Sequence, residues 1–81
     1  MAAHRVNVYR SHYVAIQCHY VASIVRPVID DIQVGDTLEF NEQILDSGEF
    51  TARVIRAVVK QIDSGSKGVV KGYNLIHFNL F

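Results

Sequence analysis

A strict alternation of apolar and polar side chains constrains this chain more than any other feature. The clearest run is 37–42, in which Leu38 and Phe40 fall on one face and the polar residues between them fall on the other. A period of two residues is typical of a strand that buries one face in a core. The alternation therefore predicts that the chain folds around a β-sheet.

Similar strand patterns recur along the sequence. The expected strands are residues 4–9, 22–25, 37–42, 50–62 and 73–81. In the long run 50–62 the apolar phase changes near Val54, Ile55 and Arg56, which predicts a bulge or a strongly bent strand. The short strand 22–25 ends before Pro27, because proline has no N–H to donate to a neighbouring strand.

One helix is expected over residues 12–21, with Ser11 as its N-cap. Apolar residues recur there in two adjacent stripes, one of Tyr13, Ile16 and Tyr20 and one of Val14, Cys18 and Val21. So wide an apolar arc predicts a helix packed against the sheet. The order of the elements predicts an α+β fold, in which a small mixed, curled β-sheet or β-barrel carries one helix after the first strand.

Length and composition limit the function classes. The 81 residues predict a single domain over 1–81, and the eight basic residues are balanced by eight acidic ones. A net charge of zero weakens a simple nucleic-acid argument, since phosphate neutralisation dominates that affinity. Cys18 is the only cysteine, so a disulfide framework is excluded, and a small buried thiol in the cytoplasm is expected. The sequence shows no signal peptide and no apolar run that predicts a membrane partner.

The segment "QVGDTLEF" predicts a corner at the entry to the strand 37–42. Gly35 permits a positive φ, and Asp36 can accept hydrogen bonds from nearby backbone N–H groups in an Asx-type turn. Ordinary packing and the rim of a binding cleft are both compatible with such a corner.

The four histidines do not predict a metal site. His12 and His19, seven residues apart on the expected helix, would lie roughly 10 Å from each other, too far to share one ion. Cys18 and His19 are adjacent and point about 100° apart on a helix, so they do not predict a catalytic dyad. The loop 63–68, "DSGSKG", lacks the phosphate-binding P-loop pattern. We expect no cofactor, no metal and no catalytic residue.

Three segments carry a resemblance to a known family: "HRVNVYRSHYVAI", "IVRPVIDDIQVGDTLEFNE" and "GYNLIHFNL". Together they resemble the ASCH domains of the PUA-like superfamily, closest to short bacterial and phage ASCH-like proteins of unassigned function. The resemblance implies a small β-barrel with a helix after the first strand, and a cleft associated with RNA or nucleotide binding. Some ASCH relatives are amidohydrolases acting on a modified cytidine.

The sequence departs from that family where catalysis would be located. The family pattern after the helix is Gly, one or two Lys, Thr and then Glu-x-Arg. Here His19 replaces the glycine, Tyr20 and Val21 replace the lysines, Ala22 replaces the threonine, Ile24 replaces the glutamate, and Arg26 is retained. Apolar side chains supply neither a nucleophile nor an acid–base group, so the sequence disfavours the amidohydrolase activity.

Two function classes follow. The first is a non-catalytic binding module that recognises RNA or a nucleotide near Arg26, because aromatic side chains stack on bases and arginine grips phosphate. Its candidate residues are Tyr9, Arg10, Arg26, Lys71 and Tyr73. Alternatively, these tyrosines complete the barrel surface and the cations are only solvated.

The second class is a protein-interaction module, such as a phage protein that binds and inhibits a host factor in the host cytoplasm. Its candidate residues are Tyr20, Val21 and Ile24, since exposed apolar patches mark partner surfaces. Formation of a homodimer through the apolar C-terminal strand is a related expectation.

Overall fold

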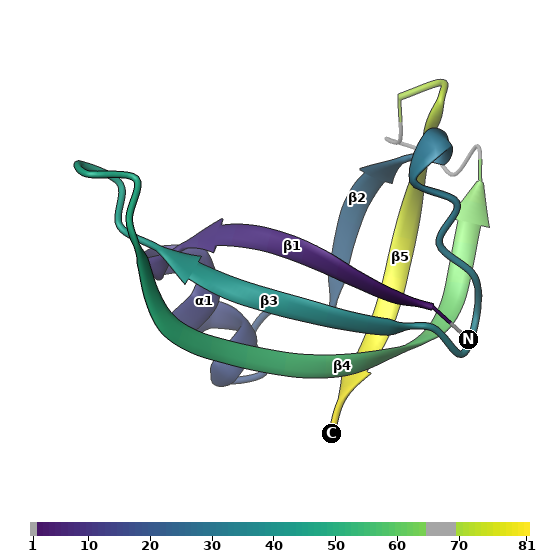
Figure 1. The fold of residues 1–81 in the computed structure, drawn as a ribbon. Helices are drawn as coiled ribbons and strands as arrows, with labels where there is room; N and C mark the ends of the chain where they lie inside the picture. Colours follow the sequence, from purple (N-terminus) through teal and green to yellow (C-terminus); the bar gives the residue numbers. More distant parts are fainter. Residues whose placement is uncertain (1, 65–69) are drawn as a thin grey trace.

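A computed structural model describes residues 2–64 and 70–81, in which one mixed sheet of five strands curls around a single α-helix (Figure 1). The elements are β1 (Ala3–Tyr9), α1 (Arg10–Gln17), β2 (Ser23–Pro27), the 3-10 turn η1 (Val28–Asp30), β3 (Thr37–Gln43), β4 (Phe50–Ser64) and β5 (Tyr73–Leu80). The expected class, a small curled and mixed sheet with a helix after the first strand, is confirmed. In the described ranges, no helix has the length and apolar character needed to cross a bilayer.

The sheet is open rather than closed. Its strand order is β1-β3-β4-β5-β2, with β1 parallel to β3 and all other neighbours antiparallel. The strands β1 and β2 are therefore the two edges, and they do not pair with each other. Of the two forms expected from the sequence, the curled sheet describes the molecule and the fully closed barrel does not.

The long strand β4 serves both halves of the sheet. Its first part pairs with β3 and its last part pairs with β5, and Ala57 and Val58 have partners on both sides. The register shifts once near Ala52, whose φ is 66°, and once between Val59 and Gln61. Bulges increase local twist, so these two irregularities accompany the curvature visible in Figure 1. The predicted bulge exists, but its predicted position at 54–56 is wrong, because those residues pair regularly with β3.

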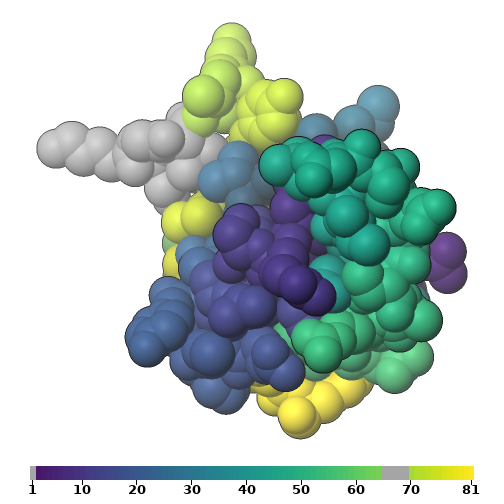
Figure 2. Space-filling view, turned by 90° about the vertical axis from the view of Figure 1, so that its left-hand side faces the viewer, coloured from purple at the N-terminus to yellow at the C-terminus, as the bar shows by residue number. Residues whose placement is uncertain are grey.

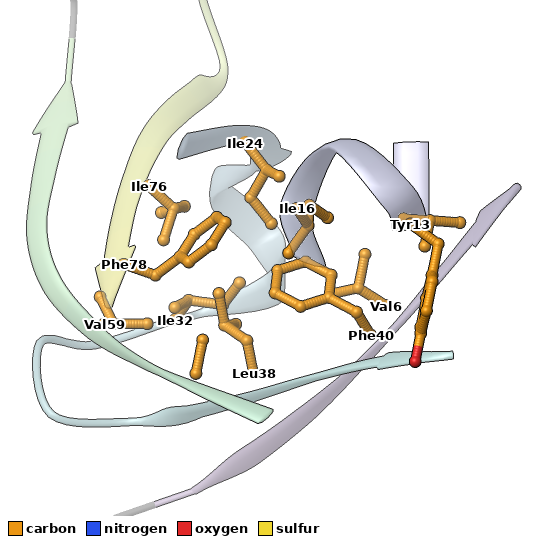
Figure 3. Close-up of a cluster of buried hydrophobic side chains, with 12 residues drawn as sticks. Val6, Tyr13, Ile16, Ile24, Ile32, Leu38, Phe40, Val59, Ile76 and Phe78 are labelled. Atoms are coloured by element: carbon orange, nitrogen blue, oxygen red, sulfur yellow. The ribbon is translucent and has the colours of Figure 1, made fainter. Parts of the chain in front are cut away.

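The core fills the concave side of the sheet, as Figure 3 shows. Phe40 of β3 and Phe78 of β5 lie at its centre, with ring centroids 5.0 Å apart and ring planes tilted by 49°. Leu38 and Ile76 are also buried, as the alternation predicted. Ile16 of α1 closes the core from the side of the helix.

The helix begins and ends earlier than the sequence predicted. Tyr9, not Ser11, is the N-cap, and it makes no side-chain capping bond. After Gln17 the chain turns through His19, which adopts a left-handed φ of 64°. The amide of His19 bonds the carbonyl of Ile16 at 3.1 Å, and the amide of Tyr20 bonds the carbonyl of Ala15 at 2.9 Å. This pair of bonds is the Schellman motif, which ends helices and favours glycine at the left-handed position.

The two apolar stripes of the helix are only partly buried. In the first stripe Tyr13 and Ile16 reach the core, whereas Tyr20 is 85% exposed. In the second stripe Val14 and Cys18 are exposed, and only Val21 packs partly against the core. The predictions of a wide buried arc and of a buried thiol are therefore wrong. The physical reason is the length of the helix: only about two turns contact β1 and β3, and these bury a single face.

Two further boundaries differ from expectation. The strand β2 runs through Pro27 instead of ending at residue 25, which an edge strand tolerates because one side needs no donor. The strand β4 continues to Ser64, so the expected loop 63–68 does not begin where predicted. Residues 65–68 of that loop lie outside the described residues.

Candidate functional site

A polar hollow lies between the two unpaired edges of the sheet. We call it the edge hollow. It is lined by Ala3, His4, Arg5 and Val6 of β1, by Arg26 of β2, and by Asp30 and Ile32 beyond it. Its volume is about 280 Å³. The hollow therefore brings together residues from the two edge strands, β1 and β2.

Arg26 is held in a fixed position on one wall of the edge hollow. Burial of Ile24 defines the core-facing side of β2, and Arg26 follows it by two residues on the same side. The Nε of Arg26 donates a hydrogen bond of 2.8 Å to Asp30 Oδ2. No other hydrogen bond joins this guanidinium to a described residue. Because arginine has five N–H donors, its terminal nitrogens remain available to a ligand.

Asp36 fixes the opposite wall. Its buried carboxylate accepts hydrogen bonds from the backbone amides of Ala2 at 3.1 Å and Gln33 at 2.9 Å, and it contacts His4 Nε2 at 2.7 Å. The hydrogen bond with His4, followed by that from Gln33, lowers the pKa of Asp36 to about 2. The positive φ at Gly35 is confirmed at 93°, and Asp36 does accept a hydrogen bond from a nearby backbone N–H. The donor is Gln33, which precedes Asp36, so the bond is not the expected Asx-type turn. The corner therefore stabilises the entry to β3, and it also positions His4 at the rim of the edge hollow.

A second hollow, of about 510 Å³, lies at the other end of β1. We call it the Glu42 hollow. It is lined by Tyr9, Arg10, Ser11, Glu42, Gln43, Ile44 and Leu45. Figure 2 shows this face of the molecule, with the start of α1 in purple beside the β3–β4 hairpin in teal and green.

Glu42 is a carboxylate in a position that the strand pattern reserves for the core. Its side chain is 1% exposed, and its Oε1 accepts a hydrogen bond of 2.7 Å from Thr51 Oγ1. The Nε of Arg10 lies 3.5 Å from Oε2. The bond from Thr51, and then the charges of Arg10 and Arg53, lower the pKa of Glu42, so the group is ionised at neutral pH.

Glu42 is not among the site residues predicted from the sequence, although the sequence carries a signal for it. Leu38, Phe40 and Glu42 share one phase of the alternation, so a core-facing carboxylate was readable two residues beyond Phe40. A charged residue on the buried phase of a strand requires partners, and it is a candidate for function.

The five candidate nucleic-acid residues do not form one surface. Arg26 lines the edge hollow, whereas Tyr9 and Arg10 line the Glu42 hollow. On β5, Asn74 pairs with Arg26 and therefore lies on the same side of the sheet as Arg26. Tyr73 is the next residue and pairs with Pro27, so its side chain faces the other side of the sheet. Lys71 is exposed in the turn before β5. Neither Lys71 nor Tyr73 lines the edge hollow.

The candidate partner-binding residues are also dispersed. Tyr20 is exposed, Val21 packs partly against the core, and Ile24 is a core residue. The prediction that Ile24 contacts a partner is therefore wrong, because its position on β2 points the side chain to the core-facing side of the sheet. Exposed apolar side chains gather instead at Val25 and along the turn η1, at Val28 and Ile29.

Two of the four histidines, His4 and His77, each pair with one carboxylate. His77 Nε2 lies 2.8 Å from Asp63 Oδ2, on the neighbouring strands β5 and β4. Bonds from Gln61 and then from His77 lower the pKa of Asp63. Within the described ranges, no three His, Cys, Asp or Glu side chains are placed to share a metal ion.

Comparison of the sequence with known proteins gave no family assignment: no family model matches the chain, and no curated protein matches it. The resemblance to ASCH domains therefore stays a prediction that rests on the three sequence segments.

Proposed function

We propose that this chain is a non-catalytic ASCH/PUA-like module that recognises RNA or a nucleotide at the edge hollow. The observation that carries the proposal is the meeting of Arg26, Arg5 and His4 around one polar hollow, between two strands that do not pair. These side chains come from opposite edges of the sheet, and the two guanidinium groups supply hydrogen-bond donors.

The charges in the edge hollow favour an anion. Arg5 and Arg26 outnumber the single carboxylate that lines it, Asp30. The bond from Arg26 Nε to Asp30 orients the guanidinium and leaves its terminal nitrogens for a phosphate. A planar guanidinium held in this way suits bidentate phosphate binding better than a lysine would.

The size of the edge hollow favours one nucleotide unit. Sites for drug-sized ligands usually enclose about 300–1,000 Å³. The edge hollow, at about 280 Å³, lies just below that range and suits a single base or a phosphate with its sugar. One nucleotide would then occupy the hollow, without contact to Lys71 or Tyr73.

The proposal excludes catalysis of the amidohydrolase type for a chemical reason. The positions that would carry lysine, threonine and glutamate hold Tyr20, Ala22 and Ile24. Ile24 is in the core, so a glutamate-like function at this position has neither the group nor the exposure it needs.

A salt-dependent binding titration tests the proposal. Fluorescence anisotropy of a labelled single-stranded RNA should show binding at low salt. With two phosphates neutralised, by Arg5 and Arg26, log K should fall with log salt at a slope of about −1.4. Arg26→Ala should weaken binding and reduce the slope by about 0.7.

Arg56→Ala is the matched control, because Arg56 is an exposed arginine on β4 that lines neither hollow. It removes the same charge from the protein and should leave the slope nearly unchanged. Absence of binding at low salt, or equal effects of the two variants, would refute recognition at the edge hollow.

A second candidate function is favoured by a separate observation. Val25, Val28 and Ile29 are exposed beside β2, which is an unpaired edge, and edge strands can accept a strand from another chain. We propose that a protein partner, including a second copy of this chain, would pair there. Strand pairing through the C-terminal strand, where the homodimer was expected, is not available because β5 lies between β4 and β2. Light scattering should then show a dimer that Val25→Lys dissociates. A monomer at all concentrations would refute the homodimer.

A further inference from the structure

Glu42 presents an unusual combination of burial and incomplete pairing. One carboxylate oxygen accepts the bond from Thr51, whereas Oε2 is buried and accepts no hydrogen bond from any described residue. Burying a charged oxygen without a hydrogen bond is costly, so such an atom usually has a partner that binds it. The group borders the Glu42 hollow rather than the sealed core.

Arg10 covers this oxygen without satisfying it. Its Nε is 3.5 Å from Oε2, beyond the usual length of a charged hydrogen bond, and its side chain is 73% exposed. A side chain with so much exposure gains little from the pair and can move aside at low cost. Arg10 is thus a replaceable neighbour, whereas Thr51 is a fixed one.

The walls around the carboxylate specify the rest of the ligand. Tyr9, Ile44 and Leu45 contribute exposed apolar surface to the hollow. A ligand that fits must place an N–H donor with positive charge at Oε2 and an apolar stem against these walls. Because only one carboxylate oxygen lacks a hydrogen bond, a compact ammonium fits better than the two-pronged fork of a guanidinium.

We propose that the Glu42 hollow binds a primary ammonium carried on an apolar stem, with Glu42 Oε2 as the acceptor and Arg10 displaced. This site is separate from the edge hollow, and it takes a cation where the edge hollow takes an anion. It also assigns Arg10 a role opposite to the one expected from the sequence: it competes with the ligand instead of gripping a phosphate.

The test is a titration of the full chain with n-butylammonium chloride, followed by amide shifts in ¹H–¹⁵N spectra. Saturable shifts are expected for residues 42–45 and for Thr51. Glu42→Gln retains an acceptor for Thr51 but loses the charge, and it should weaken binding about tenfold or more. Arg10→Ala should tighten binding about two- to fivefold, because it removes the competing cation.

1-Butanol is the matched control ligand, since it has the same stem without the charge. Equal shifts with butanol would show a purely apolar site and overturn the proposal. Weaker binding in Arg10→Ala, with the spectrum of a folded protein retained, would also overturn it, because it would make Arg10 a ligand contact. Unchanged binding in Glu42→Gln would exclude the carboxylate. Nα-acetyl-lysine amide keeps its ε-ammonium. Tighter binding of this compound than of butylammonium would support the proposal and identify a lysine side chain, rather than a free amine, as the preferred ligand.

Discussion

A left-handed residue ends α1, and replacing it with glycine should relieve backbone strain. His19 has a φ of 64° and is exposed, and no described residue hydrogen-bonds its side chain. This conformation destabilises an L-residue by roughly 1–2 kcal/mol, whereas glycine adopts it with almost no strain. Glycine loses about 0.5–1 kcal/mol through its greater freedom in the unfolded chain. His19→Gly should therefore raise the free energy of unfolding by about 0.5–1 kcal/mol.

Urea denaturation of the two proteins at pH 7 measures this difference, and a thermal melt should show a rise in Tm of about 2–8 °C. The matched control is His19→Ala, which removes the same side chain but keeps the backbone strain. The alanine variant should be no more stable than the parent. If alanine stabilises the chain as much as glycine does, the imidazole and not the backbone is responsible, and the argument from φ is refuted.

Three other perturbations test the centre of the core, the Asp36 corner and the burial of Ile24 on β2. Phe40→Leu should cost about 1–3 kcal/mol in urea denaturation, because it opens space beside a fully buried ring, whereas Phe81→Leu at the exposed C-terminus should stay within about 0.5 kcal/mol. Since the folded pKa of Asp36 is about 2, below its ordinary 3.8, its stabilising contribution is complete above pH 4 and is lost as pH falls from 4 toward 2; an acid titration of Asp36→Asn should show a shallower loss. Ile24→Asp should prevent folding, as followed by circular dichroism, because it buries an unpaired charge, whereas Tyr20→Asp should fold normally.

The strands were predictable because their signal is local. The alternation of Leu38 and Phe40, and of Ile76 and Phe78, depends only on neighbours two residues away, and all four side chains are buried. The end of the helix was not predictable in the same way. In most Schellman motifs a glycine occupies the left-handed position, and that glycine marks the end of the helix in the sequence. Here His19 occupies the position, so the sequence carries no such mark.

The bend of β4 was predictable in kind but not in place. Its bulges depend on the partners of the strand, which change from β3 to β5 along its length, and the sequence of one strand does not name its partners. The site was predictable only in part for a related reason. Arg26 could be singled out, but its neighbours Arg5 and His4 come from the opposite edge of the sheet and are brought there by the curl.

Arg26 lies on an unpaired edge of the open sheet, where it can protect the edge or bind a ligand. Unpaired edges invite other strands, and natural proteins protect them with prolines and with charges that point inward. Arg26 lies on the core-facing side of β2 and is followed by Pro27. An inward-pointing charge and a proline are the residues that typically protect an edge strand. Protection and ligand binding make different predictions for the same variant. If Arg26 only guards the edge, Arg26→Ala should increase self-association while the salt dependence of RNA binding stays that of the parent. If Arg26 binds phosphate, the slope of log K against log salt must become shallower in Arg26→Ala, whether or not the variant self-associates. The slope depends on the number of phosphates that the protein neutralises, and self-association at the edge does not change that number.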